Sequence, residues 1–298
     1  MFSVGDKVAG ERFFVLEMKE SLTKGASPRP YVTLTVTADG RQRLTGNKWN
    51  HTLSDVGCEV DDTITFDALI TEYEGTPQLD FKSSISRSSE PLTVKATKIG
   101  VTLDTVTKDF EQVCSLLNPK SMAHDFMQSF ISSPLYNEFL AAPGAVNIHH
   151  AYECGNAEHS VAVARLVIPR VSEKEKNLAI VASLLHDVGK VRSYEFAGPA
   201  IKETWEGKML GHIVLGLGMI GPMLAGYNEE FSTLLLNAIA GHHGKLEWGS
   251  PILPKTKFAL ILAQADLYDA RAQHMNDMEE WEGWSKRDRI AETELWMI

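Results

Sequence analysis

The first 90 residues carry the two-residue alternation of apolar and polar side chains that is typical of β-strands. In one run Val32, Leu34 and Val36 share a face and threonines occupy the other, which predicts a half-buried strand. The five runs of this kind are Arg12–Met18, Tyr31–Ala38, Arg43–Trp49, Thr63–Tyr73 and Gln78–Ile85. Asp39-Gly40 and Glu74-Gly75 supply hairpin turns between them. Five short strands in this length predict a small barrel or sandwich.

Beyond residue 90 the apolar positions recur every three to four residues, as in α-helices. In the segment 91–145 this repeat runs from Leu103 to Leu117 and ends at Pro119. From residue 146 to 275 the pattern is helical throughout, and the nearly all-apolar run Leu178–Leu185 predicts a buried helix. The other helical runs are Met122–Phe130, Leu135–Leu140, His212–Leu224, Phe231–Ala240 and Lys255–Ala272.

These patterns predict a multi-domain α+β protein. The expected parts are a β-rich domain over 1–90, a helical connector over 91–145, an all-α domain over 146–275 and a tail over 276–298. The tail holds seven acidic and three basic residues and the tryptophans Trp281, Trp284 and Trp296. Its aromatic content predicts that the tail docks on a surface.

Composition narrows the class of protein. The chain has 298 residues, of which 44% are hydrophobic and 23% charged, which fits a globular protein and excludes collagen-like and wholly disordered classes. The net charge of −10 argues against nucleic-acid binding over the whole surface, although it allows a local basic groove. Three scattered cysteines without a CxxC pair, no visible targeting segment and no membrane-length apolar run predict a cytoplasmic protein without a membrane partner.

The histidines concentrate in the helical part, where seven of the ten lie between His149 and His243. Each candidate ligand falls near the end of a predicted helix or on its packed face, which is how helical bundles build internal metal sites. Asp187 follows the buried run, and a carboxylate there is costly unless a cation pairs its charge. Mixed imidazole and carboxylate donors suit Mn²⁺, Fe²⁺, Co²⁺, Ni²⁺ or Zn²⁺.

The order of these residues resembles the H…HD…D signature of the HD phosphohydrolase superfamily. HDVGK at 186–190 is similar to its second motif, and ADLYDA at 265–270 is similar to its last motif. The resemblance implies that one divalent ion is bound by His159, His186, Asp187 and Asp266.

Additional histidines resemble the subset of that superfamily that holds two ions. The resemblance implies that Asp187 bridges to a second ion held by His212 and by His242, His243 or both. Two ions of Mn, Fe, Co or Ni are therefore expected, with Asp187 and Lys190 as catalytic residues and Lys190 on a substrate phosphate. Relatives with three ions carry a glutamate four residues before the first histidine, where Gly155 stands here.

A longer resemblance covers nearly the whole chain. An OB-fold followed by an HD domain is the plan of a bacterial family of 3′–5′ exoribonucleases, and the blocks at 30–34 (PYVTL), 146–160 (NIHHAYECGNAEHSV) and 241–256 (GHHGKLEWGSPILPKT) are similar to parts of that family. The resemblance implies an OB-fold for the first domain. It also makes His149 and His150, in the second of these blocks, candidates for substrate binding.

A basic stretch lies within the first domain. Between residues 19 and 49 six basic residues stand against two acidic ones, and OB-folds bind single strands through basic and aromatic side chains. The alternative is that Trp49 belongs to the core of the barrel and the basic residues form a solvated hairpin. The candidate contacts are Tyr31, Arg41, Arg43, Lys48 and Trp49.

These features favour a metal-dependent phosphodiesterase that acts as a 3′–5′ exonuclease on single-stranded nucleic acid, RNA more than DNA, by a two-metal hydroxide attack. The alternative is an HD phosphohydrolase of a small nucleotide, cyclic nucleotide or alarmone, with the OB-fold as a regulatory or assembly module. A non-enzymatic scaffold is disfavoured by the intact ligand set and by Lys190. A homo-oligomer is left open.

Overall fold

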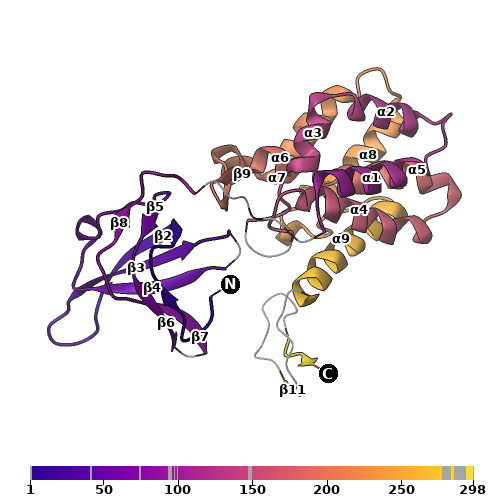
Figure 1. Ribbon diagram of the computed structural model, residues 1–298. Helices are drawn as coiled ribbons and strands as arrows, with labels where there is room; N and C mark the ends of the chain where they lie inside the picture. Colours follow the sequence, from indigo (N-terminus) through magenta and orange to yellow (C-terminus); the bar gives the residue numbers. More distant parts are fainter. Residues whose placement is uncertain are drawn as a thin grey trace. The chain divides into compact units, whose positions relative to one another are not determined.

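The computed structural model divides the chain into two units (Figure 1). One consists of Met1–Ala96 with Phe196–Lys202 and is built on a β-sheet; the other consists of Thr97–Glu195 with Glu203–Ile298 and is mainly helical. The structure describes residues 2–40, 42–73, 75–92, 96, 98, 100–146, 150–276, 283–284 and 293–297.

The sheet of the first unit has eight strands in the order β1-β6-β7-β4-β3-β2-β5-β8. Their bounds are β1 Lys7–Val8, β2 Arg12–Leu22, β3 Pro30–Thr37, β4 Leu44–Trp49, β5 Thr63–Thr65, β6 Ala68–Tyr73, β7 Thr76–Phe81 and β8 Ser86–Arg87. β5 and β6 lie near opposite ends of this order, yet only Phe66 and Asp67 separate them in the chain. The sheet therefore has to curl until its ends approach each other.

This curled sheet fits the OB-fold that the resemblance implies. Strands β4 and β7 pair in parallel, whereas the other strand pairs are antiparallel. The alternation in β3 is confirmed, because Val32, Leu34 and Val36 are fully buried. The single strand predicted over Thr63–Tyr73 is divided into β5 and β6.

The second unit packs helices around one apolar core. The helices are α1 Leu103–Cys114, α2 Met122–Ile131, α3 Pro134–Ala141, α4 Gly155–Val167, α5 Glu173–Leu185, α6 Lys190–Ser193, α7 Trp205–Met223, α8 Glu229–Gly241 and α9 Lys257–Asn276. Phe110, Phe126 and Phe139 of α1–α3 are fully buried in the same core as α4, α5 and α8. The segment predicted as a connector thus packs as part of the helical unit.

Local signals at the helix ends explain where these helices begin and end. Thr102, Ser121, Thr204 and Asn228 each accept a backbone N–H with their side chains at the start of a helix. Pro169 lies two residues after the end of α4, in the short 3-10 turn η2, Ile168–Arg170. The predicted buried run is confirmed as the second half of α5, where every residue from Ala179 to Leu185 is buried.

A strand pair interrupts the region predicted to be helical throughout, so that expectation is wrong here. β9 (Tyr194–Ala197) and β10 (Ala200–Glu203) flank Gly198-Pro199. Gly198 adopts a φ of 57°, which favours glycine, and this Gly-Pro turn is the signal that the helical pattern obscured. The tip of the hairpin belongs to the first unit, where Ala200 packs with Phe14 and Leu92.

The acidic tail is described only in two short pieces. β11 (Gly283–Trp284) pairs with β12 (Trp296–Met297), and the exposed rings of Trp284 and Trp296 lie 5.5 Å apart. Trp281 lies outside the described residues. Across the described ranges no helix combines the length and apolar character that crossing a membrane requires.

Two glycines shape the region where the start of α6 packs against α7. Gly211, with φ 71° and ψ 155°, breaks α7, so His212 begins its second segment rather than the whole helix as predicted. Gly189 lies against the turn that follows: a Cβ at Gly189 would overlap the carbonyl oxygen of His212 and crowd the backbone nitrogen of Gly216. Both contacts are to backbone atoms, which cannot rotate away.

We predict that Gly189→Ala lowers the free energy of unfolding by at least about 1–3 kcal/mol, the usual effect of overpacking. Gly189 has ordinary helical angles, so the loss would be steric. Gly218→Ala in α7 is the matched control, because a Cβ there meets nothing within 4 Å; it should stabilise by up to about 1 kcal/mol. Urea unfolding followed by circular dichroism measures both, and equal midpoints for Gly189→Ala and the unchanged protein would contradict this packing.

Candidate metal centre

The carboxylate of Asp187 lies between two groups of histidines. Asp187 follows α5 and is only 2% exposed. Its Oδ2 atom is 3.4 Å from Nε2 of His159 and 3.3 Å from Nε2 of His186. Its Oδ1 atom is 3.3 Å from Nε2 of His212 and 3.4 Å from Nε2 of His242. Each oxygen of one carboxylate therefore faces a different pair of imidazoles.

The first group comes from three helices. His159 lies in the second turn of α4, His186 caps the end of α5 and Asp266 lies in α9. Asp266 Oδ1 is 3.0 Å from Nε2 of His159 and 3.7 Å from Nε2 of His186. One ligand atom from each of these residues and from Asp187 lies within 4.8 Å of all the others. This is the set of four residues expected to bind the first ion.

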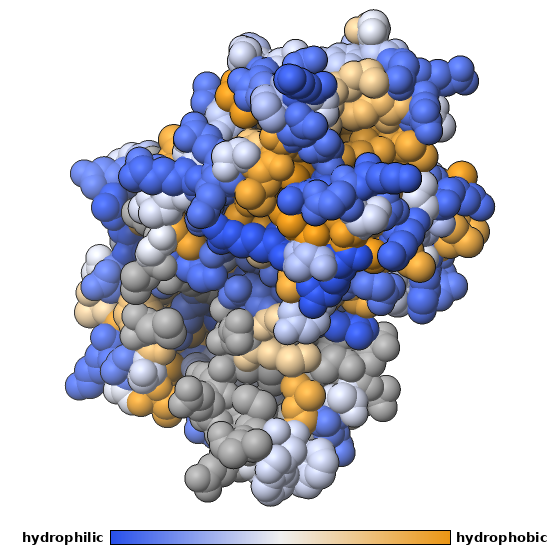
Figure 2. Space-filling view, turned by 90° about the vertical axis from the view of Figure 1, so that its right-hand side faces the viewer, coloured by the Kyte–Doolittle hydropathy of each residue, from blue (hydrophilic) through white to orange (hydrophobic). Residues whose placement is uncertain are grey.

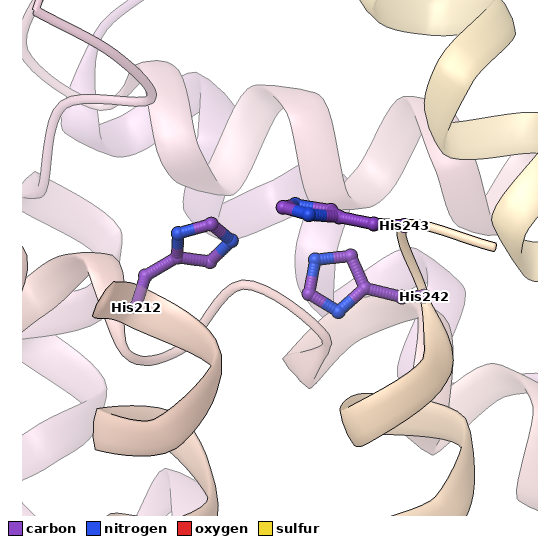
Figure 3. A group of neighbouring side chains, drawn as sticks. All are labelled: His212, His242 and His243. Carbon is purple, nitrogen blue, oxygen red and sulfur yellow. The ribbon is translucent and has the colours of Figure 1, made fainter. Parts of the chain in front are cut away.

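The second group consists of His212, His242 and His243, whose ligand atoms also lie within 4.8 Å of one another. His212 comes from α7, and the other two follow α8, so the three rings converge from two helices (Figure 3). The ring of His243 is 5.0 Å from that of His212 and 4.5 Å from that of His242 between centroids.

Backbone carbonyl groups orient three of the rings. A carbonyl oxygen accepts only from an N–H, so Nδ1 carries a proton and Nε2 is the nitrogen left to bind an ion. For His186 and His242 the acceptor is three residues earlier, at the end of the preceding helix. The acceptors are Ser183 for His186 at 2.8 Å, Ile239 for His242 at 2.7 Å and Trp248 for His243 at 2.6 Å.

Three of the atoms at the centre are buried without a hydrogen-bond partner. They are Oδ1 of Asp187, Nε2 of His212 and Nε2 of His242. Leaving such atoms unpaired is costly in a folded protein. A divalent cation would satisfy all three at once, and the imidazole and carboxylate donors suit it. The residues present therefore fit a metal ion.

The electrostatics of the two groups differ. Burial would lower the pKa of His159, but the carboxylates of Asp187 and Asp266 raise it well above its ordinary value. Burial is the main cause that lowers the pKa of His212 to about 3. His212 is therefore a neutral ligand as it stands, whereas ions at the first group would displace protons, because a metal binds the unprotonated ring.

Lys190 supplies a positive charge beside these carboxylates. It is 7% exposed, and its Nζ atom lies 2.6 Å from Oδ2 of Asp187. Burial would lower its pKa, but the charge of Asp187 raises it, so the ammonium stays charged. Lys190, Tyr194 and Trp248 line a pocket of about 350 Å³ together with Asp187, His212, His243 and Asp266.

A larger hollow of about 500 Å³ lies between α4 and α9. Leu166, Leu260 and Ile261 line it, with Arg170 and Gln264 among its few polar residues. The face drawn in Figure 2 also shows hydrophobic residues bordered by hydrophilic ones. None of the clustered histidines and carboxylates lines this hollow, so the smaller polar pocket is the one that can carry chemistry.

His150 has a different environment from the one expected of a substrate contact. It is 2% exposed, and its two ring nitrogens lie 3.0 Å from Oε2 of Glu158 and 2.9 Å from Oδ2 of Asp269. Both nitrogens are engaged within the protein, which favours a supporting role for this side chain. His149 lies outside the described residues.

The candidate contacts of the first unit separate into two faces. Tyr31 pairs with Trp49 across β3 and β4, with ring centroids 4.8 Å apart. Trp49 is 55% exposed, which excludes a place in the barrel core. Arg43 is exposed and lies just before β4. Because side chains alternate along a strand, Arg43 and Trp49, six positions apart, share a face. Arg41 lies outside the described residues.

Lys48 lies on the opposite face from Trp49, because neighbouring residues of a strand alternate. Its Nζ atom donates to the carbonyl of Ser83 at 2.5 Å and lies 5.0 Å from the ring centroid of Phe81. The expectation that Lys48 joins the aromatic pair in substrate binding thus conflicts with its strand register.

Sequence reasoning missed Asp269, which accepts a hydrogen bond from Nδ1 of His159 at 2.7 Å. The signal was present in ADLYDA, because residues three apart share a helix face and Asp269 follows Asp266 by three. It also missed Glu158, whose contact with His150 could not be read from spacing alone.

Comparisons with known proteins agree with this centre. The HD domain family matches residues 156–271, and HD domains bind divalent metals. The 3′–5′ exoribonuclease YhaM of Geobacillus sp. (strain WCH70) is 29% identical over 276 residues, covering 88% of this chain and 83% of that protein. The 3′–5′ exoribonuclease YhaM of Oceanobacillus iheyensis is 30% identical over 282 residues, covering 89% of this chain and 86% of that protein.

No solved structure matched the chain. The matched domain contains both groups of histidines, and the two relatives align with nearly the whole sequence. The chain is therefore a metal-dependent phosphohydrolase that belongs to the family of the YhaM 3′–5′ exoribonucleases.

Proposed function

We propose that this protein removes nucleotides from the 3′ end of single-stranded RNA, with two divalent ions held on either side of Asp187. The observation that carries the proposal is the division of that carboxylate between two imidazole groups, with Oδ1 left unpaired. Both relatives are named exoribonucleases, which supports RNA rather than DNA as the substrate.

The residues would hold the ions as follows. His159, His186 and Asp266 would bind the first ion with one oxygen of Asp187, and His212 and His242 would bind the second with the other oxygen. His243, the third member of the second group, has a ligand atom within 4.8 Å of those of His212 and His242 and could add a further donor to the second ion. The donors suit Mn²⁺, Fe²⁺, Co²⁺ or Ni²⁺.

When bound, such a pair of ions supplies an activated water at neutral pH and neutralises phosphoryl oxygens. The chain itself supplies the rest. Lys190 places a fixed positive charge at the pocket where a phosphate would enter. The carbonyl groups behind His186, His242 and His243 keep the rings aimed without further reorganisation.

Substrate size follows from the pocket. A volume of about 350 Å³ is at the small end for ligand sites and suits the end of one strand better than a base-paired duplex. In the first unit, Tyr31, Trp49 and Arg43 offer aromatic rings and a positive charge on one sheet face, which is how OB-folds hold unpaired bases. We assign strand capture to this face and cleavage to the helical unit.

The direct test uses 5′-labelled single-stranded RNA with Mn²⁺, resolved on a denaturing gel. Progressive shortening of the labelled strand with release of mononucleotides is expected. Turnover of free nucleotides without shortening of the RNA would contradict the proposal and favour a phosphohydrolase of small nucleotides.

Asp187→Asn keeps the shape of the side chain but removes the charge shared by the two groups. We predict that bound metal falls and that RNA cleavage drops by more than about 10²-fold. Asp109→Asn is the control, because it removes a carboxylate that pairs with Arg165 at the surface. Metal content by mass spectrometry and the RNA assay measure the result; an Asp187→Asn protein with full metal content and activity would refute the assignment.

Lys190→Met keeps the volume of the buried side chain but removes its charge. We predict a fall in kcat of about 10²–10³-fold, the usual loss for one transition-state charge contact, with metal content unchanged. The control is Lys208→Met on the exposed side of α7. Unaltered kinetics in Lys190→Met would place this ammonium outside the reaction.

Tyr31→Ala combined with Trp49→Ala should weaken binding of long single-stranded RNA. Each stacked base contributes about 1–3 kcal/mol, so we predict a roughly 5- to 100-fold higher Kd per lost ring. Hydrolysis of a small phosphodiester should stay unchanged, because the candidate metal ligands lie in the helical unit. Leu22→Ala, an exposed residue on the opposite face of β2, is the control; unchanged RNA affinity in the double variant would exclude this face as the capture site.

A further inference from the structure

A row of hydrogen-bonded polar side chains, buried or partly buried, lies behind His159, on the side away from Asp187. Oδ2 of Asp269 is 2.7 Å from Nδ1 of His159 and 2.9 Å from Nε2 of His150. Nδ1 of His150 is in turn 3.0 Å from Oε2 of Glu158. The side chains of His150 and His159 are almost fully buried, and that of Asp269 is 16% exposed.

The acceptors determine the direction of these hydrogen bonds. A carboxylate oxygen accepts, so the ring nitrogens that face Asp269 donate. His159 therefore keeps a proton on Nδ1, and Nε2, which faces Asp187 and Asp266, is the nitrogen that would give its lone pair to an ion. Unlike His186, His242 and His243, which donate to neutral backbone carbonyls, His159 donates to a charged group, which makes its other nitrogen a stronger ligand.

Two further polar side chains contact Glu158, at the end of the row away from His159. Nζ of Lys98 is 3.2 Å from Oε1 of Glu158 and 3.2 Å from the hydroxyl of Tyr152. The Tyr152 hydroxyl also donates to Glu158. Glu158 is thus held from three sides, and it can in turn hold the ring of His150 in place.

The same atoms could instead be read as a third metal site, since His150, His159 and Asp269 offer ligand atoms within 4.8 Å of one another. However, one oxygen of Asp269 already lies at hydrogen-bond distance from both rings. An ion there would have to bind Nδ1 of His159 while Nε2 of the same ring binds the first ion. In the hydrogen-bonded arrangement His159 binds a single ion, through Nε2.

We propose that Asp269, His150 and Glu158 are positioning residues that hold His159 in its Nδ1–H form and thereby strengthen binding of the first metal ion. Asp269 acts directly on His159, and Glu158 acts through His150 on Asp269. The inference rests on the metal-ligand assignment proposed above, but it does not depend on which phosphodiester is cleaved.

The test is a titration of the full-length, metal-stripped protein with Mn²⁺, followed by calorimetry, without any substrate. We expect the unchanged protein to bind two ions and Asp269→Ala to bind one of them about 10–100-fold more weakly, the usual effect of removing such a partner. Asp269→Asn keeps an acceptor but loses the charge, so its affinity should lie between the two. Glu158→Gln, one step further away, should show a smaller loss than Asp269→Ala.

Asp109→Ala at the surface is the matched control and should bind both ions as the unchanged protein does. Unfolding in excess chelator checks that each variant folds; if Asp269→Ala does not, Asp269→Asn and Glu158→Gln carry the test. Unchanged affinity in the Asp269 and Glu158 variants would overturn the inference. So would three ions in the unchanged protein with one lost in Asp269→Ala, because the cluster would then be a metal site itself.

Failure of the proposed function gives a different result. If Mn²⁺ binds and the graded loss is seen but RNA is not shortened, the positioning role stands and the substrate assignment falls. If the unchanged protein binds no divalent ion, the ligand assignment and this inference fall together.

Discussion

The candidate metal centre is organised around one buried carboxylate. Asp187 is almost inaccessible, yet four imidazoles and the ammonium of Lys190 approach its two oxygens. A charge in this position is tolerated only where opposite charge or a cation meets it. The apolar second half of α5 buries the residue, and Gly189 lets the backbone at His212 come close enough to complete the second group.

Helix ends do much of the positioning. His186 and His242 each follow a helix and donate Nδ1–H to the carbonyl group three residues earlier, so the end of the helix itself aims the ring. Gly211 allows α7 to break just before His212. Helices thus hold the chemical groups, whereas the aromatic pair of the first unit, Tyr31 and the exposed Trp49, lies on a face of a sheet.

Much of this arrangement could be predicted from the sequence, because periodicity reports burial directly. The alternation around Val32 and the apolar run before His186 led to the correct elements, and the HD motif placed the ligands. Asp269 shares a helix face with Asp266, but its partners His150 and His159 lie more than 100 residues away in the sequence. The contact of Glu158 with His150 depends on how the turn before α4 folds. The side of the strand on which Lys48 lies depends on register, and the β9–β10 pair depends on a Gly-Pro turn inside a largely helical pattern.

The central claim is that Asp187 joins two metal ions. Anomalous diffraction from crystals of the protein grown with Mn²⁺, recorded at the manganese absorption edge, tests it most directly. The account predicts two peaks flanking the Asp187 carboxylate, one beside His159, His186 and Asp266 and one beside His212 and His242. A single peak that contacts only one oxygen of Asp187, or peaks remote from this residue, would contradict it.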